Sequence, residues 1–178
     1  MVAAEKMASF ERDKNIAILF GDGAGACLVS PRGTGLEIVD SVLHSDGAWS
    51  DQLCYDWSGE LRMNGPTVIM QAARKVPAAI SELLGRNGVP VDSVTKFLMH
   101  QANQNLMDRV ARALRVPEDR FYSNIRRYGN TSSASMLIAA AEWYEAADLR
   151  PGDLVGMAAF GAGFHWGALL CRYKDELL

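Results

Sequence analysis

Residues 134–141, with the sequence ASMLIAAA, are apolar or small on every face that a helix could present. In a soluble protein such a helix is buried on all sides. The run LVGMAAF at residues 154–160 shows no alternation of apolar and polar residues, as expected of a strand covered on both faces. The chain must therefore fold in layers. A single sheet with helices on its two sides covers the strand but hardly the helix, so something else must pack against residues 134–141.

The rest of the sequence alternates strand and helix signals without repeats or low-complexity linkers. Apolar periodicity predicts helices at 66–88, 103–114 and 131–147, with Pro77 kinking or splitting the first. Residues 21–26, GDGAGA, read as a tight glycine turn. Apolar and β-branched runs predict strands at 15–20 (NIAILF), 27–30 (CLVS), 35–46, 94–100, 120–125, 153–160 and 164–173. This pattern predicts an α/β layered fold with a mixed sheet.

The bulk composition fits one soluble domain over residues 1–178, because 49% of the residues are hydrophobic and 22% are charged. No apolar run approaches the roughly 18 residues of a membrane span, and residues 1–15 lack the apolar segment of a signal peptide. We therefore expect a cytoplasmic protein with no membrane partner. The net charge of -3 argues against general binding to nucleic acid.

Three cysteines, Cys27, Cys54 and Cys171, have neither the spacing of a zinc site nor the even count of a disulfide framework. We expect free thiols and no metal. Cys54 lies in a polar loop and is the one plausible reactive thiol, but no neighbouring base or helix start would lower its pKa.

The segment 109–127 is locally basic, with six arginines against Glu118 and Asp119. Such a patch is either a solvated face or a surface that docks an anionic partner. The residues alone leave both interpretations open.

Five motifs follow one another along the chain: LFGDGAGA at 19–26, HQAN at 100–103, RRYGNTSSAS at 126–135, RPGDLV at 150–155 and AFGAGFHWGALL at 159–170. In order and spacing they resemble the carboxy-terminal half of β-ketoacyl-acyl-carrier-protein synthase III, a thiolase-fold condensing enzyme, from about Glu5 to Tyr173. The single histidine of HQAN, followed about thirty residues later by YGNTS, separates this group from the two-histidine condensing enzymes.

The resemblance implies a thiolase-like half with a mixed five-stranded sheet and helices on both faces. In the family, two similar halves pack face to face around paired central helices, and the helix after Asn130 would be one of that pair. The nucleophilic cysteine belongs to the amino-terminal half, and no residue of this chain matches it. The resemblance therefore implies half of an acyltransferase, inactive alone, with the other half as its partner.

The resemblance also implies a decarboxylating Claisen condensation of acyl-CoA with malonyl-acyl-carrier-protein in fatty acid or polyketide biosynthesis, without a cofactor. His100 and Asn130 match the two residues that hydrogen-bond the malonyl thioester carbonyl as it becomes an enolate. The backbone N–H of Ala162 would join an oxyanion hole, although FGAGF also reads as a glycine-permitted hairpin. His165 stands where the family usually has a small hydroxyl residue, and we assign it no catalytic role.

The resemblance also implies a pantetheine channel and a docking face for acyl carrier protein. The positions that match its pantetheine channel are Met63, Gly65, Ile69, Ala102, Asn103, Leu106 and, at the inner end, Phe160. Helical spacing predicts that Leu106, Val110 and Leu114 face the core, with Asn105, Arg109 and Arg112 on the opposite side. That side matches the docking face for acyl carrier protein, with Arg109 and Arg112 retained and one family arginine replaced by Asn105.

Two other functions remain open at this point: an acyltransferase of the same fold that does not decarboxylate, and a non-catalytic interaction module. We also expect the isolated chain to form a homodimer. The apolar face with Met136, Leu137 and Ile138 would otherwise be left exposed, and a two-fold contact would cover it.

Overall fold

A four-stranded mixed sheet forms the centre of the fold in the computed structural model, which describes residues 1–6, 14–55 and 60–175. Its strands lie in the order β3 (Gly35–Ser45), β8 (His165–Lys174), β7 (Leu154–Gly161) and β6 (Val94–Met99). The pairs β3–β8 and β8–β7 are antiparallel, whereas β7–β6 is parallel. The predicted α/β class and mixed sheet are confirmed.

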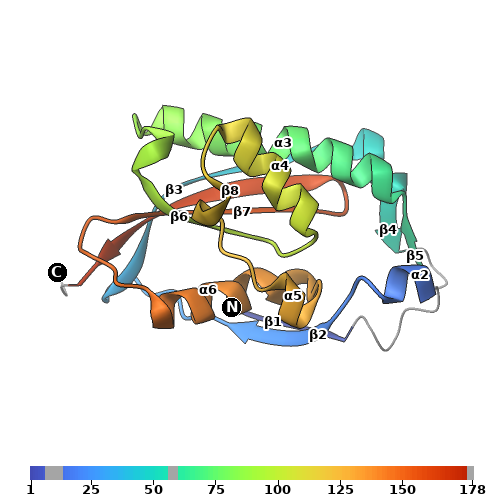
Figure 1. Cartoon of the computed structure of the whole chain (residues 1–178), viewed down its shortest axis with the longest axis horizontal. Coiled ribbons are helices and arrows are strands. Elements are labelled where there is room, and N and C mark those ends of the chain that lie inside the picture. The colour runs from blue at the N-terminus through green and yellow to red at the C-terminus, as the bar shows by residue number, and fades with distance from the viewer. Residues whose placement is uncertain (7–13, 56–59, 176–178) are drawn as a thin grey trace.

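Helices cover both faces of this sheet, as predicted. Helices α3 (Gly65–Arg86) and α4 (Gln104–Leu114) lie on one face, and α6 (Ser135–Ala146) lies on the other (Figure 1). The larger core lies under α3 and α4, where Phe97, Val76 and Val110 are fully buried.

Helix α3 begins at Asn64, whose Oδ1 accepts a hydrogen bond from the Thr67 N–H at 3.3 Å. It then runs without a break through the buried Pro77. The predicted split at Pro77 is therefore wrong, because burial of this face against the sheet and α4 holds the helix together where local propensity would end it.

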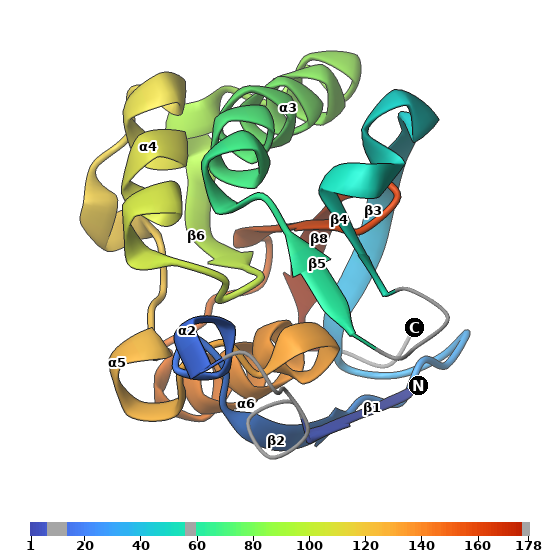
Figure 2. The ribbon, with the colours of Figure 1, turned by 90° about the vertical axis from the view of Figure 1, so that its right-hand side faces the viewer.

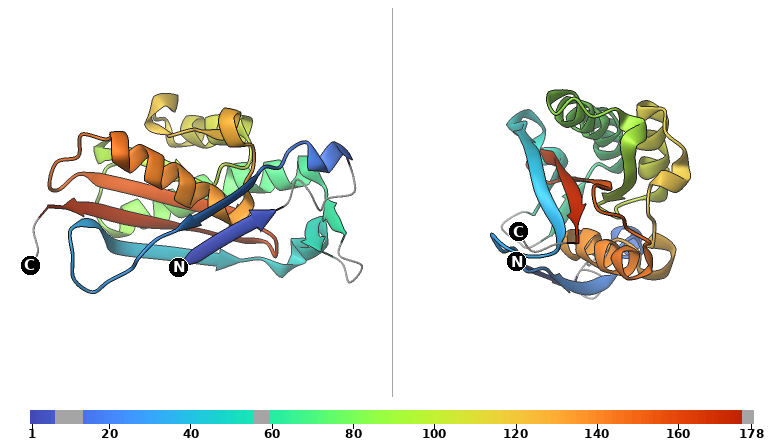
Figure 3. Two further views of the ribbon diagram at one scale, coloured as in Figure 1. Left: turned by 90° about the horizontal axis from the view of Figure 1, so that it is seen from below. Right: turned by 90° about the vertical axis from the view of Figure 1, so that its left-hand side faces the viewer.

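A two-stranded antiparallel ribbon of β1 (Val2–Lys6) and β2 (Asp22–Ala26) lies beyond α6, on the side away from the sheet (Figures 1 and 3). The molecule thus has four layers: α3 with α4, the sheet, α6 and the ribbon. The ribbon is the additional layer that the apolar sequence of residues 134–141 requires.

The glycines of GDGAGA form part of a strand and not the predicted turn. A Cβ at Gly25 would lie 2.6 Å from the Leu137 Cβ, and one at Gly23 would lie 2.9 Å from the Ile138 Cδ1. Because alternate residues of a strand face the same side, these glycines let β2 lie directly on α6. The motif therefore reflects close packing of a strand on a helix.

Helix α6 is less buried than its sequence predicts. Ser135, Ala139 and Trp143 are buried, whereas Ala141 and Tyr144 are exposed. Residues 136–138 are half-buried because the ribbon covers part of that face. The expectation of a helix buried all round is thus wrong within this chain, and the apolar face expected to be bare is partly occupied.

The sheet has four strands within the described residues, against the five predicted. Residues 14–17 form the short helix α2 (Lys14–Ala17) instead of a strand, and only Phe20 makes a β-bridge, to Asn130. Residues 27–30 lie outside the strands, and 120–125 contribute a single bridge from Phe121 to Phe97. These runs have β propensity, but propensity forms a strand only where a neighbouring strand pairs with it.

Smaller elements complete the chain. A hairpin of β4 (Leu53–Tyr55) and β5 (Leu61–Met63) leads into α3 (Figure 2), and α5 (Ile125–Tyr128) precedes the turn at Gly129. Short 3-10 helices span Gly47–Gln52, Val91–Ser93, Glu118–Arg120 and Ser132–Ala134. In the part of the chain that the structure describes, no helix has the length and apolar character needed to cross a membrane.

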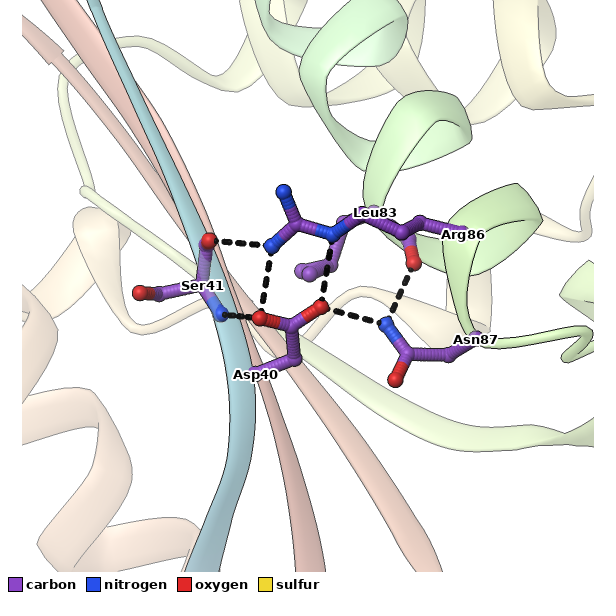
Figure 4. Close-up of polar contacts among 5 residues, drawn as sticks. All are labelled: Asp40, Ser41, Leu83, Arg86 and Asn87. Atoms are coloured by element: carbon purple, nitrogen blue, oxygen red, sulfur yellow. Dashed lines mark hydrogen bonds and ion pairs between the residues drawn. The ribbon is translucent and has the colours of Figure 1, made fainter.

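The carboxylate of Asp40 ties the end of α3 to β3 (Figure 4). It accepts hydrogen bonds from Arg86 Nε at 2.8 Å and Nη2 at 2.6 Å, and from Asn87 Nδ2 at 2.8 Å. Arg86 Nη2 also donates to the Ser41 carbonyl at 2.7 Å. The Arg86 guanidinium, followed by the Asn87 amide, holds the pKa of Asp40 well below its usual range.

Candidate active site

His100 directly follows β6, where the parallel pair β6–β7 ends. Its backbone N–H donates to the Ala158 carbonyl of β7 at 2.9 Å, so the residue continues the ladder. Its ring Nδ1 lies 2.5 Å from the Ser135 Oγ at the start of α6. Burial lowers the pKa of His100 to about 4. The imidazole is therefore neutral at pH 7, with one N–H to donate.

Asn130 lies between Gly129 and the short helix before α6. Its N–H donates to the Leu19 carbonyl at 3.1 Å, and its carbonyl accepts from the Gly21 N–H at 3.0 Å. The side-chain Oδ1 accepts from the Ser132 N–H at 2.9 Å. Because Oδ1 is engaged in this turn, the Nδ2 amide is the side-chain group that is oriented to donate to another molecule.

A cavity of about 590 Å³ lies between β3, β7 and β8 of the sheet and the start of α6. Its lining includes His100, Phe160, His165, Met136 and Ser132, the residue that binds Asn130 Oδ1. The walls are mostly apolar, so a charge that developed beside His100 would be poorly hydrated and strongly affected by nearby donors.

The turn that joins β7 to β8 lies at the rim of this cavity. Phe160 and Gly161 line the cavity, whereas Ala162 is exposed at the tip and lies outside the lining. His165 Nδ1 lies 2.7 Å from the Ser45 Oγ. A Cβ at Gly163 would lie 2.2 Å from the His165 ring, so glycine is needed there for space as well as for its φ of 129°.

The positions assigned to a pantetheine channel gather elsewhere, at the start of two helices. Met63, Gly65 and Ile69 lie at the end of β5 and in the first turns of α3. Ala102, Asn103 and Leu106 lie at the start of α4; only Phe160 among the channel positions lines the cavity.

Asn103 occupies the N-cap position of α4, yet its side chain makes no capping hydrogen bond. Its Oδ1 is buried and has no hydrogen-bond partner among the described residues. An amide oxygen buried without a donor costs about 1–3 kcal/mol. The start of α4 therefore holds a buried acceptor that no described residue satisfies.

Helix α4 has the two faces that its sequence predicts. Leu106, Val110 and Leu114 are buried, and Asn105, Arg109 and Arg112 are exposed. Part of the predicted basic patch has a structural use, because Arg120 Nη1 donates to the Val94 carbonyl at 2.7 Å and Arg127 pairs with Glu142 at 3.2 Å. The free cationic surface of the 109–127 segment is thus smaller than its six arginines indicate.

Two residues of this region were not predicted from the sequence. Ser135 lies against His100, and Glu142 of α6 accepts hydrogen bonds from Tyr128 Oη at 2.5 Å and Asn124 Nδ2 at 2.9 Å. These donors, the Tyr128 hydroxyl first, hold the pKa of Glu142 below its usual value. Glu142 lies 12 residues after Asn130, about two helical turns into α6, so only the tertiary structure brings it back to the 124–128 segment.

The cysteines lack the surroundings of a nucleophile. Burial raises the pKa of the Cys171 thiol to about 11, and Cys54 Sγ has a weak contact of 4.0 Å with the Asp51 carbonyl. All three thiols are free. Among the described residues, no group of three or more His, Cys, Asp or Glu side chains is placed to hold a metal ion.

Two parts of the chain match models of one protein family. Residues 84–173 match the model described as 3-oxoacyl-[acyl-carrier-protein (ACP)] synthase III C terminal, and residues 1–47 match the model described as 3-oxoacyl-[acyl-carrier-protein (ACP)] synthase III. The first match alone spans half of the chain. The chain belongs to the 3-oxoacyl-[acyl-carrier-protein] synthase III family.

Members of the synthase III family from several bacteria are similar to this chain over most of its length. The Beta-ketoacyl-[acyl-carrier-protein] synthase III of Microcystis aeruginosa is 35% identical over 180 residues, which cover 92% of this chain and 54% of that protein. For the Aquifex aeolicus relative the identity is 34%, with 97% of this chain and 57% of that protein covered. The chain therefore spans about half the length of the curated relatives it matches.

Solved synthase III structures confirm the thiolase-like fold. The Aquifex aeolicus enzyme superposes with a TM-score of 0.89 at 34% identity, covering 97% of this chain and 56% of that one. The Thermus thermophilus enzyme superposes with a TM-score of 0.89 at 32% identity, covering 98% of this chain and 59% of that one. The priming β-ketosynthase of the R1128 polyketide pathway gives 0.81 at 29% identity, covering 98% and 56%.

Proposed function

We propose that this chain forms the carboxy-terminal half of a decarboxylating condensing enzyme, in which His100 and Asn130 stabilise the enolate of a malonyl thioester. The observation that carries the proposal is a neutral His100 ring at the cavity, together with Asn130, which is bound to Ser132 of the cavity wall. His100 is a neutral imidazole that lines the cavity. Asn130 has its Oδ1 bound by Ser132, which lines the same cavity, so its amide nitrogen remains to donate.

The chemistry of decarboxylation explains why two donors suit this reaction. When CO₂ leaves the malonyl group, the electron pair of the broken C–C bond moves into the thioester, and the carbonyl oxygen becomes an enolate oxygen. Fixed donors that bind this oxygen favour the transition state over the substrate, because the negative charge grows along the reaction. Losing one such donor typically costs about 3–4 kcal/mol of barrier.

The nucleophile has to come from outside these 178 residues. Burial raises the pKa of the Cys171 thiol to about 11, and the chain covers about half the length of its relatives. We therefore propose that the amino-terminal half supplies the cysteine, and that the Ala162 backbone N–H completes an oxyanion hole for its acyl group. The whole of residues 1–178 would then act as one unit of a two-part enzyme.

Acyl-CoA and malonyl-acyl-carrier-protein are the proposed substrates, with no cofactor. Both carry pantetheine, and Asn103, at the start of α4, is one of the residues proposed to line its channel. Met63, Gly65, Ile69, Ala102, Leu106 and Phe160 are the other proposed channel residues. The exposed Arg109 and Arg112 of α4 are proposed to dock the acidic carrier protein. The cytoplasmic location and the homodimer expected from the sequence stay predictions.

The decisive experiment joins the chain to an amino-terminal half of the family by co-expression. We expect CO₂ release from malonyl-acyl-carrier-protein by the pair and no condensation by the chain alone. In the pair, His100→Ala or Asn130→Ala should reduce decarboxylation by about 10²–10³-fold while acyl transfer from labelled acyl-CoA to the partner's cysteine persists.

The matched control is His44→Gln, which removes an imidazole that lies outside the cavity. Acyl transfer without decarboxylation by the unsubstituted pair would instead identify a non-decarboxylating acyltransferase. An assembled pair with neither activity would indicate an interaction module. An acyl adduct on one of the three cysteines of the chain alone would contradict the division of roles.

A further inference from the structure

We propose that Ser135 fixes the tautomer of His100, with the ring proton on Nε2, and so acts as a positioning residue for the enolate donor. The tautomer assignment rests on the hydrogen bonds of this chain. Its catalytic meaning rests on the proposed function above.

The Ser135 hydroxyl joins two groups at the end of β6. Its oxygen lies 2.5 Å from His100 Nδ1 and 3.1 Å from the backbone nitrogen of Gln101. The side chain is only 2% exposed, so water does not readily replace either contact. A backbone N–H can only donate, and the Ser135 oxygen therefore accepts from Gln101.

The remaining question is the direction of the bond to His100. If Nδ1 carried the proton and donated it, the hydroxyl hydrogen of Ser135 would have no acceptor among its described contacts. If the hydroxyl donates to an unprotonated Nδ1, every group in the contact is satisfied. Buried polar hydrogens are almost always paired, so the geometry points to the second arrangement.

This arrangement leaves the single proton of the neutral ring on Nε2. Nδ1 is held at α6, and His100 lines the cavity, so Nε2 is the nitrogen left to meet a substrate. An N–H at Nε2 attracts an enolate oxygen, whereas the other tautomer would direct a lone pair at it. The Ser135 hydroxyl, in the first turn of α6, thereby determines whether His100 Nε2 attracts or repels the enolate oxygen.

The Gln101 side chain fixes the backbone that donates to Ser135. Its Nε2 donates to the Met99 carbonyl at 2.8 Å and to the Tyr122 carbonyl at 3.2 Å, and its Oε1 accepts from the Asn124 N–H at 3.2 Å. With both ends of this buried side chain engaged, the Gln101 backbone N–H stays aimed at Ser135, and the hydroxyl hydrogen stays aimed at His100.

Nitrogen NMR of the imidazole tests the tautomer directly on this chain. In a His44→Gln, His165→Gln background, His100 is the one remaining histidine. At pH 7 we expect a protonated Nε2 and an unprotonated Nδ1. Ser135→Ala should shift the ring to a mixture of tautomers, and Ser135→Thr should restore the Nε2–H form. Ser123→Ala, at an exposed serine, is the control and should leave the signals unchanged.

A protonated Nδ1 in the His44→Gln, His165→Gln chain that retains Ser135 would overturn the proposal, even if Ser135→Ala failed to fold. An unchanged tautomer in a folded Ser135→Ala chain would overturn it as well.

The complete two-part enzyme supplies the kinetic readout. Ser135→Ala should lower kcat for decarboxylation by about 10–100-fold, as loss of a residue that orients a catalytic histidine commonly does. KM should change little, and Ser135→Thr should recover the rate. A rate within two-fold of the unsubstituted enzyme, with the tautomer mixed, would show that Ser135 does not serve catalysis. If the unsubstituted pair fails to decarboxylate, the proposed function fails, and the NMR result still decides the tautomer.

Discussion

Burial of the His100 ring links the candidate site to the stability of the fold. The pKa of His100 is lowered to about 4, compared with 6.5 for a free histidine. The unfolded chain therefore binds a proton between these values that the folded chain does not bind. Stability that is present above pH 6.5 is lost as the pH falls through this window.

We expect the free energy of unfolding to drop by about 3 kcal/mol between pH 7 and pH 4 through this residue. Urea denaturation at a series of pH values measures it. His100→Gln should flatten the dependence, whereas His44→Gln, which removes a surface imidazole beside Glu82, is the matched control. An equal slope with and without His100 would contradict the assigned burial effect.

Individual site residues differ in how far the sequence reveals them. His100 and Asn130 were predicted because HQAN and YGNTS match motifs of the family that the sequence resembles. Ser135 has only small neighbours in the sequence and reads as an ordinary helix residue. Its importance comes from a hydrogen bond across 35 residues, which no local pattern encodes.

Among the elements, the contact between α3 and β3 depends on one carboxylate. Asp40 is bound by Arg86 and Asn87 at the end of α3, and these donors keep its pKa well below the usual range. Its contribution to stability is therefore present above pH 3.8 and is lost as the pH falls below that value.

Asp40→Asn should lower the melting temperature at pH 7, because the amide places an N–H group where donors already point. The difference from the unsubstituted chain should shrink below about pH 4, where the carboxyl group begins to take up a proton. Calorimetry at pH 7 and pH 3 makes the comparison. The exposed Asp51 provides the control substitution Asp51→Asn, and an equal loss in both variants would mean that the Arg86 contact has no special role.

The elements that the sequence predicts well are those with strong period signals and tertiary partners, namely α3, α4, β6, β7 and β8. The errors cluster in residues 15–30, where NIAILF has strand propensity but forms α2 and a turn, and GDGAGA has turn composition but forms β2. In both cases the packing against neighbouring elements determines the secondary structure of the segment. Pairing with β1 and contact with α6 make the glycines a strand, and neither partner is visible from the local sequence.

At the scale of the whole molecule, the ribbon and the residues at its ends, Met1 and 27–30, carry apolar side chains that no described layer of this chain covers. Val2 is 76% exposed and Leu28 is 92% exposed, and Met1 and Val29 are also exposed. Exposed apolar groups of this kind mark a surface for another protein. Leu137 and Ile138, the residues first expected to form a dimer contact, are instead partly covered by β2.

We therefore expect the isolated chain to self-associate through the ribbon and the adjoining residues 27–30 at micromolar concentrations. Leu28→Lys combined with Val29→Thr should lower the mass measured by light scattering, with Leu43→Lys as the control, because Leu43 is equally exposed but lies on the sheet. If the double substitution left the associated mass unchanged, the result would favour the α6 contact predicted from the sequence. A monomer at every concentration would contradict both.

The close packing of β2 on α6 links the ribbon to the position of Asn130, the proposed enolate donor. Asn130 is held by the strand end, through Leu19 and Gly21, and the missing Cβ of Gly25 sets how near that strand lies to the helix. A methyl group at Gly25 would clash with the Leu137 side chain and push β2 away from α6. The Asn130 backbone, which is hydrogen-bonded to Leu19 and Gly21, would then move as well. A substitution at Gly25, four residues after Gly21, would thus change the position of Asn130 without altering the cavity lining, and under the proposed function it would lower the rate of decarboxylation.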